Sequence, residues 1–212
     1  MKKSSTVVAI AILAMGLVVA QEPPGWVPLG DISSATRILD MLEIPGTSIL
    51  LASGQGGSFN WYRYVWRSTD GGATWATVIA PLEYQGPDFV QLDRDSASGR
   101  LWALKQTSGA NTLYYSTDNG ANWTGASGPS ASPAVVGNTM QVVDDYVYFG
   151  GTIGSPYSIS LYRLHQTDLT WEELVVYPEC DAITQLKWQD DRLFVFCRDR
   201  DEAKVRVFTY TP

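Results

Sequence analysis

Residues 68–75 read Ser-Thr-Asp-Gly-Gly-Ala-Thr-Trp, and residues 116–123 read Ser-Thr-Asp-Asn-Gly-Ala-Asn-Trp. The two copies start 48 positions apart (116 − 68), and six of their eight residues are identical. A further step of 48 reaches residues 164–171, where Trp171 is retained and Asp168 falls on a glycine position. One step of 49 back from Trp75 reaches Trp26. A fixed period of this length predicts a repeat architecture.

The two conserved copies have the composition of a β-hairpin corner. The aspartate accepts hydrogen bonds from turn amides, glycine supplies a positive φ, and the serine hydroxyl ties the incoming strand to the turn. The tryptophan packs as an apolar plug. The residues given these structural roles are Ser68, Asp70, Gly72 and Trp75 in the first copy, and Ser116, Asp118, Gly120 and Trp123 in the second. The motif therefore predicts a structural corner and no reactive centre.

Short apolar runs recur between the corners in a regular order. First strands are expected at 37–42, 89–93, 140–143 and 183–188, and buried second strands at 48–52, 100–104, 146–150 and 192–196. Third strands are expected at 62–67, 112–115, 160–163 and 205–210, and each corner tryptophan opens a fourth. Four strands per period of 48 are typical of a propeller blade.

The pattern S-x-D-x-G-x-x-W resembles the Asp box, or BNR repeat, of sialidases, sortilin-type receptors, xyloglucan hydrolases and photosystem II assembly factors. The resemblance covers essentially the whole chain after residue 20 and implies an all-β propeller of four-stranded antiparallel blades. It also implies that the box lies on the turn between the third and fourth strands, on the face away from the ligand. Asp70 and Asp118 are therefore not expected to be catalytic.

The phase of the repeat predicts how the propeller closes. The chain ends after a third strand, and the segment around Trp26 has the position of a fourth strand. We expect one domain over residues 21–212 with four blades, closed by the N-terminal strand joining the last blade. A fragment of a larger propeller is the alternative.

Residues 1–20 have the order of a secretory signal peptide. Lys2 and Lys3 precede an apolar run over 7–19, and Ala20 is a small residue at the expected cleavage point. A membrane anchor would need a longer run of about 20 apolar residues. We therefore expect a secreted or periplasmic protein with no stable membrane span after cleavage. In that compartment Cys180 and Cys197 either form a disulfide or remain a buried thiol and a separate loop thiol.

The composition excludes several partners. A net charge of −7 gives no basic face for nucleic acid or an anionic membrane surface. One histidine and two cysteines are too few for an ordinary zinc site, so neither a metal nor a cofactor is expected. The single histidine, His165, lies in the degenerate third copy of the motif, which disfavours a Ser-His-Asp triad.

Ligand contacts are expected on loops of the face opposite the corners, where a rigid scaffold presents variable residues. The candidates are Arg37, Phe59, Trp61, Tyr62, Glu83, Tyr84, Tyr157, Glu179, Arg198 and Arg200. The aromatic ones suit stacking on sugars, or else they fold back to cap the first blade. The charges near Arg198 bind a carboxylate or neutralise one another. Arg37, Gln91, Gln141 and Gln185 recur on first strands, where they either contact a ligand in the central channel or hold water there.

The sequence favours binding over catalysis. Residues 36–39, Thr-Arg-Ile-Leu, keep only the Arg-Ile of the sialidase Arg-Ile-Pro element, and no spacing selects a pair of catalytic carboxylates. We therefore expect a non-catalytic module that binds a glycan or an extracytoplasmic protein. The alternatives are a sialidase-like glycoside hydrolase and an assembly or scaffold factor.

Overall fold

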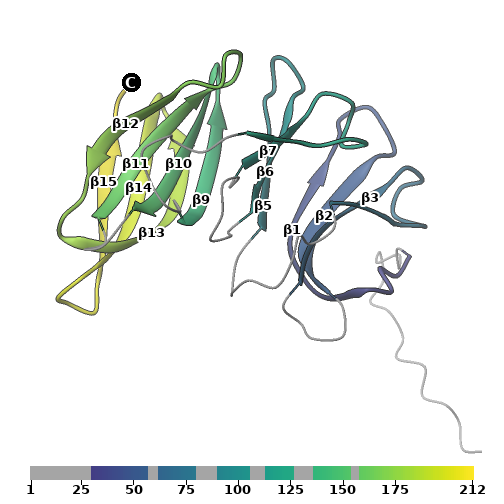
Figure 1. Ribbon diagram of the computed structural model, residues 1–212, viewed down its shortest axis with the longest axis horizontal. Helices are drawn as coiled ribbons and strands as arrows, with labels where there is room; N and C mark the ends of the chain where they lie inside the picture. The colour runs from purple at the N-terminus through teal and green to yellow at the C-terminus, as the bar shows by residue number, and fades with distance from the viewer. Residues whose placement is uncertain (1–29, 57–61, 80–89, 106–112, 127–135, 154–157) are drawn as a thin grey trace, which may run out of the picture.

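The structure is a computed structural model that describes residues 30–56, 62–79, 90–105, 113–126, 136–153 and 158–212. These ranges form fifteen strands in four antiparallel sheets (Figure 1). The predicted all-β fold of four propeller blades is confirmed. None of these ranges contains a helix that is long and apolar enough to cross a membrane.

Each blade is a meander in which neighbouring strands pair in chain order. Blade 1 holds β1 (Ala35–Glu43), β2 (Leu50–Gly56), β3 (Tyr62–Ser68) and β4 (Ala76–Ile79). Blade 2 holds β5 (Val90–Arg94), β6 (Leu101–Lys105), β7 (Leu113–Ser116) and β8 (Thr124–Ala126). Blade 3 holds β9 (Val136–Val143), β10 (Tyr146–Ile153), β11 (Ser158–His165) and β12 (Trp171–Val176). Blade 4 holds β13 (Cys180–Gln189), β14 (Arg192–Asp199) and β15 (Val205–Tyr210).

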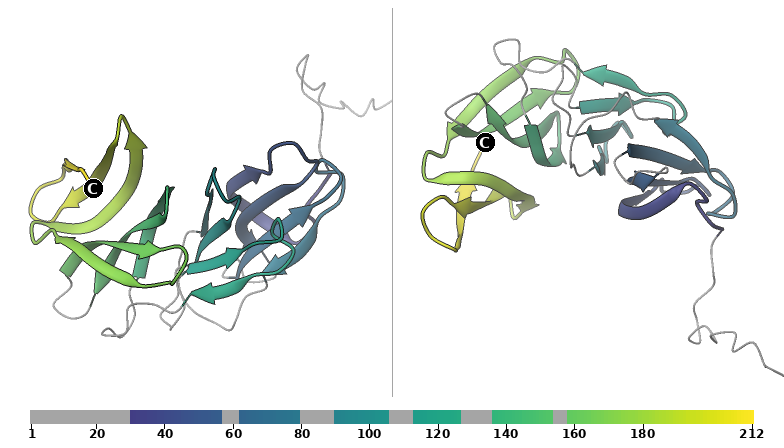
Figure 2. Two further views of the ribbon diagram at one scale, coloured as in Figure 1. Left: turned by 90° about the horizontal axis from the view of Figure 1, so that it is seen from above. Right: turned by 60° about the horizontal axis from the view of Figure 1, so that its bottom comes forward.

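The blades follow one another around an arc, with blade 1 at one end and blade 4 at the other (Figure 2). In the described residues blade 4 has three strands where the other blades have four. The segment around Trp26, which is predicted to supply its fourth strand, lies outside the described residues. That part of the closure stays a prediction.

Apolar side chains fill the spaces between neighbouring blades. Leu51 and Val65 of blade 1 pack with Leu92 and Leu101 of blade 2, and similar clusters join blade 2 to blade 3 and blade 3 to blade 4. The innermost strand of each later blade lies against the blade before it. β13, for example, contacts β9, β10 and β11. The core is therefore a series of sheet-on-sheet interfaces, which is the packing expected of a propeller.

Hydrogen bonds from main chain to side chain also join the innermost strands of successive blades. Asp40 accepts one from the N–H of Leu92 at 2.8 Å. Asp93 accepts one from the N–H of Val142 at 2.7 Å. The same direction continues to blade 4, where the N–H of Trp188 donates to Gln141 at 3.4 Å. We call these three contacts the inter-blade links.

Both copies of the corner motif adopt one hydrogen-bonded turn between the third and fourth strands. Ser68 Oγ accepts from the N–H of Gly72 at 2.8 Å and donates to Asp70 at 2.7 Å, while Asp70 accepts from the N–H of Thr74 at 2.9 Å. The second copy repeats these contacts with Ser116, Asp118 and Asn122. In both copies the indole of the tryptophan donates to a glycine carbonyl, from Trp75 to Gly72 and from Trp123 to Gly120.

The backbone of the turns explains the choice of residues. Gly71 and Gly72 have φ of 71° and 95°, and Asn119 and Gly120 have 55° and 79°. Asparagine and glycine tolerate this left-handed region best. The hydrogen bonds from Thr74 lower the pKa of Asp70 to about 2, and those from Asn122 do the same for Asp118. Both carboxylates are thus held ionised by the turns that they close.

Candidate functional site

Side chains from the innermost strands of all four blades line a hollow of about 790 Å³. Its side chains come from β1, β5, β9 and β13, with one residue from β14. The lining residues are Arg37, Leu39, Asp40, Gln91, Thr139, Ala182, Ile183, Thr184, Gln185, Leu186 and Arg198. The hollow therefore combines two guanidinium groups, two amides, two hydroxyls and one carboxylate with four apolar residues. Its volume is in the range of small-ligand sites.

Two arginines supply the positive charge of the hollow from opposite ends of the arc. Arg37 lies on β1, and its exposed guanidinium has no hydrogen-bond or ion-pair partner among the described residues. Arg198 lies at the end of β14, where its Nε is 2.7 Å from Asp181 Oδ1. That hydrogen bond to Asp181 raises the pKa of Arg198. Arg37 is the group most available to a ligand.

The amide and hydroxyl groups of the wall are held by the backbone. Gln91 donates through Nε2 to the carbonyl of Met140 at 2.9 Å and accepts at Oε1 from the N–H of the same residue at 3.0 Å. Thr139 donates to Gln91 Oε1 at 3.2 Å and accepts from the N–H of Leu186 at 3.3 Å. Because each group is fixed by a neighbouring blade, the wall of the hollow is preorganised for recognition.

Asp40 is the one carboxylate among the described lining residues. Burial raises its pKa, and hydrogen bonds from the N–H groups of Leu92 and Met41 oppose this rise. Both oxygens already serve as acceptors, Oδ2 from Leu92 and Oδ1 from Met41. Asp40 therefore joins blade 1 to blade 2 at the edge of the hollow.

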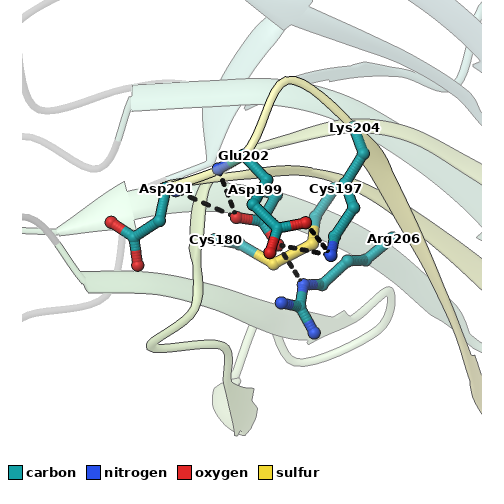
Figure 3. Close-up of polar contacts among 7 residues, drawn as sticks. All are labelled: Cys180, Cys197, Asp199, Asp201, Glu202, Lys204 and Arg206. Carbon is teal, nitrogen blue, oxygen red and sulfur yellow. Dashed lines mark hydrogen bonds and ion pairs between the residues drawn. A yellow bond between two sulfur atoms is a disulfide. The ribbon is translucent and has the colours of Figure 1, made fainter.

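A disulfide and a buried aspartate fix the strand end that carries Arg198 (Figure 3). Cys180 and Cys197 are joined, with Cα atoms 5.9 Å apart. Asp199 accepts from the N–H groups of Asp201 and Glu202, at 2.9 Å each, and from the Arg206 guanidinium. The Arg206 hydrogen bond is the main cause that lowers the pKa of Asp199 to about 2. Both chain neighbours of Arg198 are thus held in place, Cys197 by the disulfide and Asp199 by its hydrogen bonds to the β14–β15 turn and Arg206.

The disulfide depends on the register of the β13–β14 hairpin. Ile183 pairs with Cys197 and Cys180 pairs with Asp199, and one irregularity in β13, between Cys180 and Ala182, separates these pairs. Cys180 therefore lies diagonally across from Cys197, close enough for the bond. Of the two fates left open by the sequence, the disulfide is the one formed.

The structure brings only some of the predicted ligand contacts together. Arg37 and Arg198 both line the hollow, whereas Glu179 and Arg200 are not among its lining residues. The backbone N–H of Arg200 instead donates to the carbonyl of Glu179 at 2.9 Å, beside the disulfide. Tyr62 begins β3 and pairs with Gly56. Phe59, Trp61, Glu83, Tyr84 and Tyr157 lie outside the described residues.

The polar residues expected in the channel separate into two groups. Gln91 and Gln185 line the hollow as predicted, but Gln141 forms an inter-blade link and donates to Asp93 at 3.0 Å. Thr139 was missed because β9 begins at Val136, four residues before the predicted start of this strand at Met140. The alternation of side chains along β9 would have placed Thr139 on the face of Gln141 had the strand been extended.

A second hollow, of about 370 Å³, lies at the degenerate third copy of the motif. It contains the single histidine, whose Nδ1 is 3.0 Å from Asp168 Oδ1. Arg163 forms an ion pair with Glu172 at 2.7 Å and lies over the ring of Tyr146. Its charged groups are therefore paired with one another. No group of three or more His, Cys, Asp or Glu side chains that could hold a metal ion occurs in the described part of the chain.

Comparison with known proteins identifies solved structures of similar fold. No family model and no curated protein matches the chain. Among solved structures, it is similar to the GH74 xyloglucanase from Xanthomonas campestris, with 18% identity and a TM-score of 0.54 over 77% of this chain. It is also similar to the GH93 α-L-arabinofuranosidase of Fusarium graminearum, with 12% identity and a TM-score of 0.52 over 86% of this chain. A third match is a chain of a nidogen/laminin complex, with 10% identity and a TM-score of 0.54 over 82%.

At these identities the likeness is one of fold. The chain spans 27% of the xyloglucanase chain and 65% of each of the other two. The matched structures include two glycoside hydrolases and a protein from an intermolecular complex, so the likeness does not distinguish a catalytic function from a binding function.

Proposed function

We propose that this chain is an exported, non-catalytic propeller module that binds an acidic glycan in its central hollow. The observation that carries the proposal is the placement of Arg37, without a partner among the described residues, in a hollow that also presents Arg198 and fixed amide groups. Guanidinium groups recognise carboxylates through two parallel hydrogen bonds, and amides and hydroxyls suit the hydroxyl groups of a sugar.

The lining supports binding more than hydrolysis. Ordinary glycoside hydrolysis uses two carboxyl groups on opposite sides of the scissile bond, about 5–10 Å apart. Among the described residues that line the hollow, Asp40 alone is acidic, and its oxygens hold the backbone of β1 and β5. Asp181 lies nearby but forms an ion pair with Arg198. Among the described residues, the geometry therefore offers contacts to a bound glycan without an assembled acid and nucleophile.

Titration calorimetry with two sugars of similar length would test the proposal. We expect an oligogalacturonate to bind and a neutral xyloglucan oligosaccharide to bind at least tenfold more weakly. Arg37→Ala should weaken oligogalacturonate binding by tenfold or more, and Arg198→Ala should weaken it less because Arg198 is partly satisfied by Asp181. Arg192→Ala, an exposed arginine at the opposite end of β14, is the matched control and should leave binding unchanged.

Two results would overturn the proposal. Equal binding of both sugars, or an Arg37→Ala variant with full affinity, would remove the assigned role of the hollow. Release of reducing ends that is lost in Asp40→Asn would instead make the protein a hydrolase.

A protein ligand is the second candidate, favoured by the likeness to a chain of the nidogen/laminin complex. It predicts a stable protein partner whose binding is insensitive to Arg37→Ala. Failure of both sugars to bind, together with such a partner, would select the scaffold function.

A further inference from the structure

The third copy of the corner motif departs from the other two at several positions, and three of these line one hollow. His165 stands where both conserved copies have threonine, and Asp168 stands where both have glycine. Glu172 follows the motif tryptophan, where the conserved copies have alanine and threonine. All three side chains line the hollow of about 370 Å³ at this corner. Departures from a regular pattern that gather in one place are expected at functional sites.

The register of blade 3 puts four of the lining side chains on one face of the sheet. Tyr146 of β10 lies opposite His165 of β11, and Arg163 of β11 lies opposite Glu172 of β12. His165 and Arg163 are two positions apart on β11, so they point to the same side. The hollow is therefore formed by strand pairing on one side and by the turn that carries Asp168 on the other.

The polar contacts within the hollow use only one oxygen of each carboxylate. Asp168 accepts through Oδ1 from the N–H and the hydroxyl of Thr170, at 3.0 and 2.7 Å, and the same oxygen lies 3.0 Å from His165 Nδ1. Glu172 binds the Arg163 guanidinium through Oε2. These contacts leave Oδ2 of Asp168 and Oε1 of Glu172 unused.

The imidazole adds a third acceptor. Hydrogen bonds from Thr170 lower the pKa of Asp168 to about 2, so its carboxylate is ionised and can only accept. In the neutral imidazole the proton therefore lies on Nδ1 of His165, and Nε2 is an acceptor. Two carboxylates and one guanidinium also leave the lining with a net negative charge at neutral pH. The hollow is thus suited to a cation that carries further hydrogen-bond donors.

A free amino group on a sugar ring meets these conditions. Its ammonium offers three donors to the two carboxylates, and a neighbouring hydroxyl can donate to His165 Nε2. The half-buried ring of Trp171 gives the sugar carbons an apolar surface with which an ammonium also interacts favourably. A lysine side chain carries the same ammonium, but its stem has no hydroxyl for the imidazole and would leave that acceptor without a partner.

We propose that this hollow binds one hexosamine unit with a free amino group. Asp168 and Glu172 hold the ammonium, and His165 accepts from a hydroxyl beside it. The volume of the hollow lies in the lower part of the range for small-ligand sites, which suits a single sugar unit. The hollow shares no lining residue with the central one, and its charge has the opposite sign. Binding here therefore does not depend on an acidic glycan in the central hollow.

Titration calorimetry of the mature chain at neutral pH tests this site with three probes. We expect a trimer of glucosamine to bind, and the trimer of N-acetylglucosamine to bind at least tenfold more weakly because acetylation removes the positive charge. Nα-acetyl-lysine amide, the probe for a protein side chain, should also bind at least tenfold more weakly than the glucosamine trimer.

Two isosteric variants test the assigned carboxylates. Asp168→Asn keeps an oxygen for Thr170 but places an amide donor where the ammonium needs an acceptor, and Glu172→Gln removes the second charge. Each should weaken binding of the glucosamine trimer by tenfold or more. Asp145→Asn is the matched control, since it removes one charge from an exposed aspartate in the β9–β10 turn, outside the lining, and should leave binding unchanged. Circular dichroism and urea midpoints establish that all three variants remain folded.

Four results would overturn the proposal. Equal binding of the acetylated trimer would show that the amino group is not recognised, and equal binding of the lysine derivative would indicate a protein ligand. Folded Asp168→Asn and Glu172→Gln variants with full affinity, or a loss as large in Asp145→Asn, would show that the trimer binds elsewhere or only through overall charge. Failure of the glucosamine trimer to bind the wild type would remove the site.

Discussion

The Asp93 carboxylate on β5 accepts a hydrogen bond of 2.7 Å from the backbone N–H of Val142 on β9. The same oxygen accepts from the side chain of Gln141 at 3.0 Å. One side chain thus holds the edge of the next blade, and Asp40 and Gln141 do the same at the interfaces on either side.

Asp93→Ala should lower the free energy of unfolding by about 1–3 kcal/mol, because it leaves the Val142 N–H and the Gln141 amide without their acceptor. Asp93→Asn should cost less, since an amide oxygen can still accept both bonds. Urea unfolding at neutral pH measures the difference. Equal losses in the two variants would contradict the role of the acceptor oxygen.

The pH dependence of Asp93 has a definite sign. Burial raises its pKa above the ordinary value of 3.8, more than the hydrogen bonds from Val142 and Arg94 lower it. A group whose pKa is raised in the folded state binds its proton more tightly there than in the unfolded state. Its contribution to stability is therefore fully present below the unfolded pKa and is lost as pH rises through the folded pKa. The wild type should therefore gain stability relative to Asp93→Asn as pH falls from 7 to 4. A difference that is flat over this range would contradict the prediction.

Protonation of four other aspartates should destabilise the protein in acid. Asp70, Asp118, Asp168 and Asp199 all have a pKa lowered to about 2 by hydrogen bonds in the folded state. A lowered pKa contributes stability above the unfolded value of about 4 that is lost as pH falls toward the folded value. We expect the urea midpoint to fall between pH 4 and 2, and to fall less in Asp70→Asn.

The corner serines should contribute measurably to the free energy of unfolding. Ser68 is buried, accepts from the Gly72 N–H and donates to Asp70. Ser68→Ala should cost about 1–2 kcal/mol by leaving that N–H unsatisfied, and Ser116→Ala should cost a similar amount. Ser96→Ala, at an exposed position in the β5–β6 turn, is the control. A loss in the control as large as in Ser68→Ala would refute the specific role of the corner.

The disulfide should stabilise blade 4 chiefly by restricting the unfolded chain. A separation of 17 residues between Cys180 and Cys197 corresponds to about 3 kcal/mol of loop-closure entropy. The double variant Cys180→Ser/Cys197→Ser should lose about that amount in urea unfolding. Reduction of the wild type should reproduce the loss, and reduction of the double variant should change nothing.

The close approach of β10 and β13 predicts the effect of adding one methyl group. Gly150→Ala should cost about 1–3 kcal/mol through overpacking against Ile183. Combined with Ile183→Ala, it should cost less than the sum of the two single variants, because the contact has been removed from one side. Strict additivity would show that the two positions do not meet.

The repeat predicted most of the strands because its spacing is set by local interactions in the turns and strands. Ser68, Asp70 and Trp75 must hold the same spacing to form one turn, and the apolar runs between turns must cover the same length of blade. The channel position of Arg37 followed from the same phase, since equivalent residues of repeated units occupy equivalent places.

The inter-blade links could not be predicted from the sequence. Asp40, Asp93 and Gln141 are two aspartates and a glutamine that bind main-chain groups 52, 49 and 47 positions away, so no side chain in the sequence marks the partner. The burial of β14 was also predicted only in part. Phe194 and Phe196 read as part of a strand buried on both sides, but both are half-buried and point away from the side on which Leu193 and Val195 pack against blade 3.

The direction of the inter-blade links has a consequence for how such a molecule can grow during evolution. In each link the donating blade supplies an amide N–H, which any residue except proline provides, and the accepting side chain belongs to the blade before it. A gene duplication that appends one more unit therefore needs no particular side chain in the newcomer to form the link itself. Rings of different sizes can arise from one unit by this route.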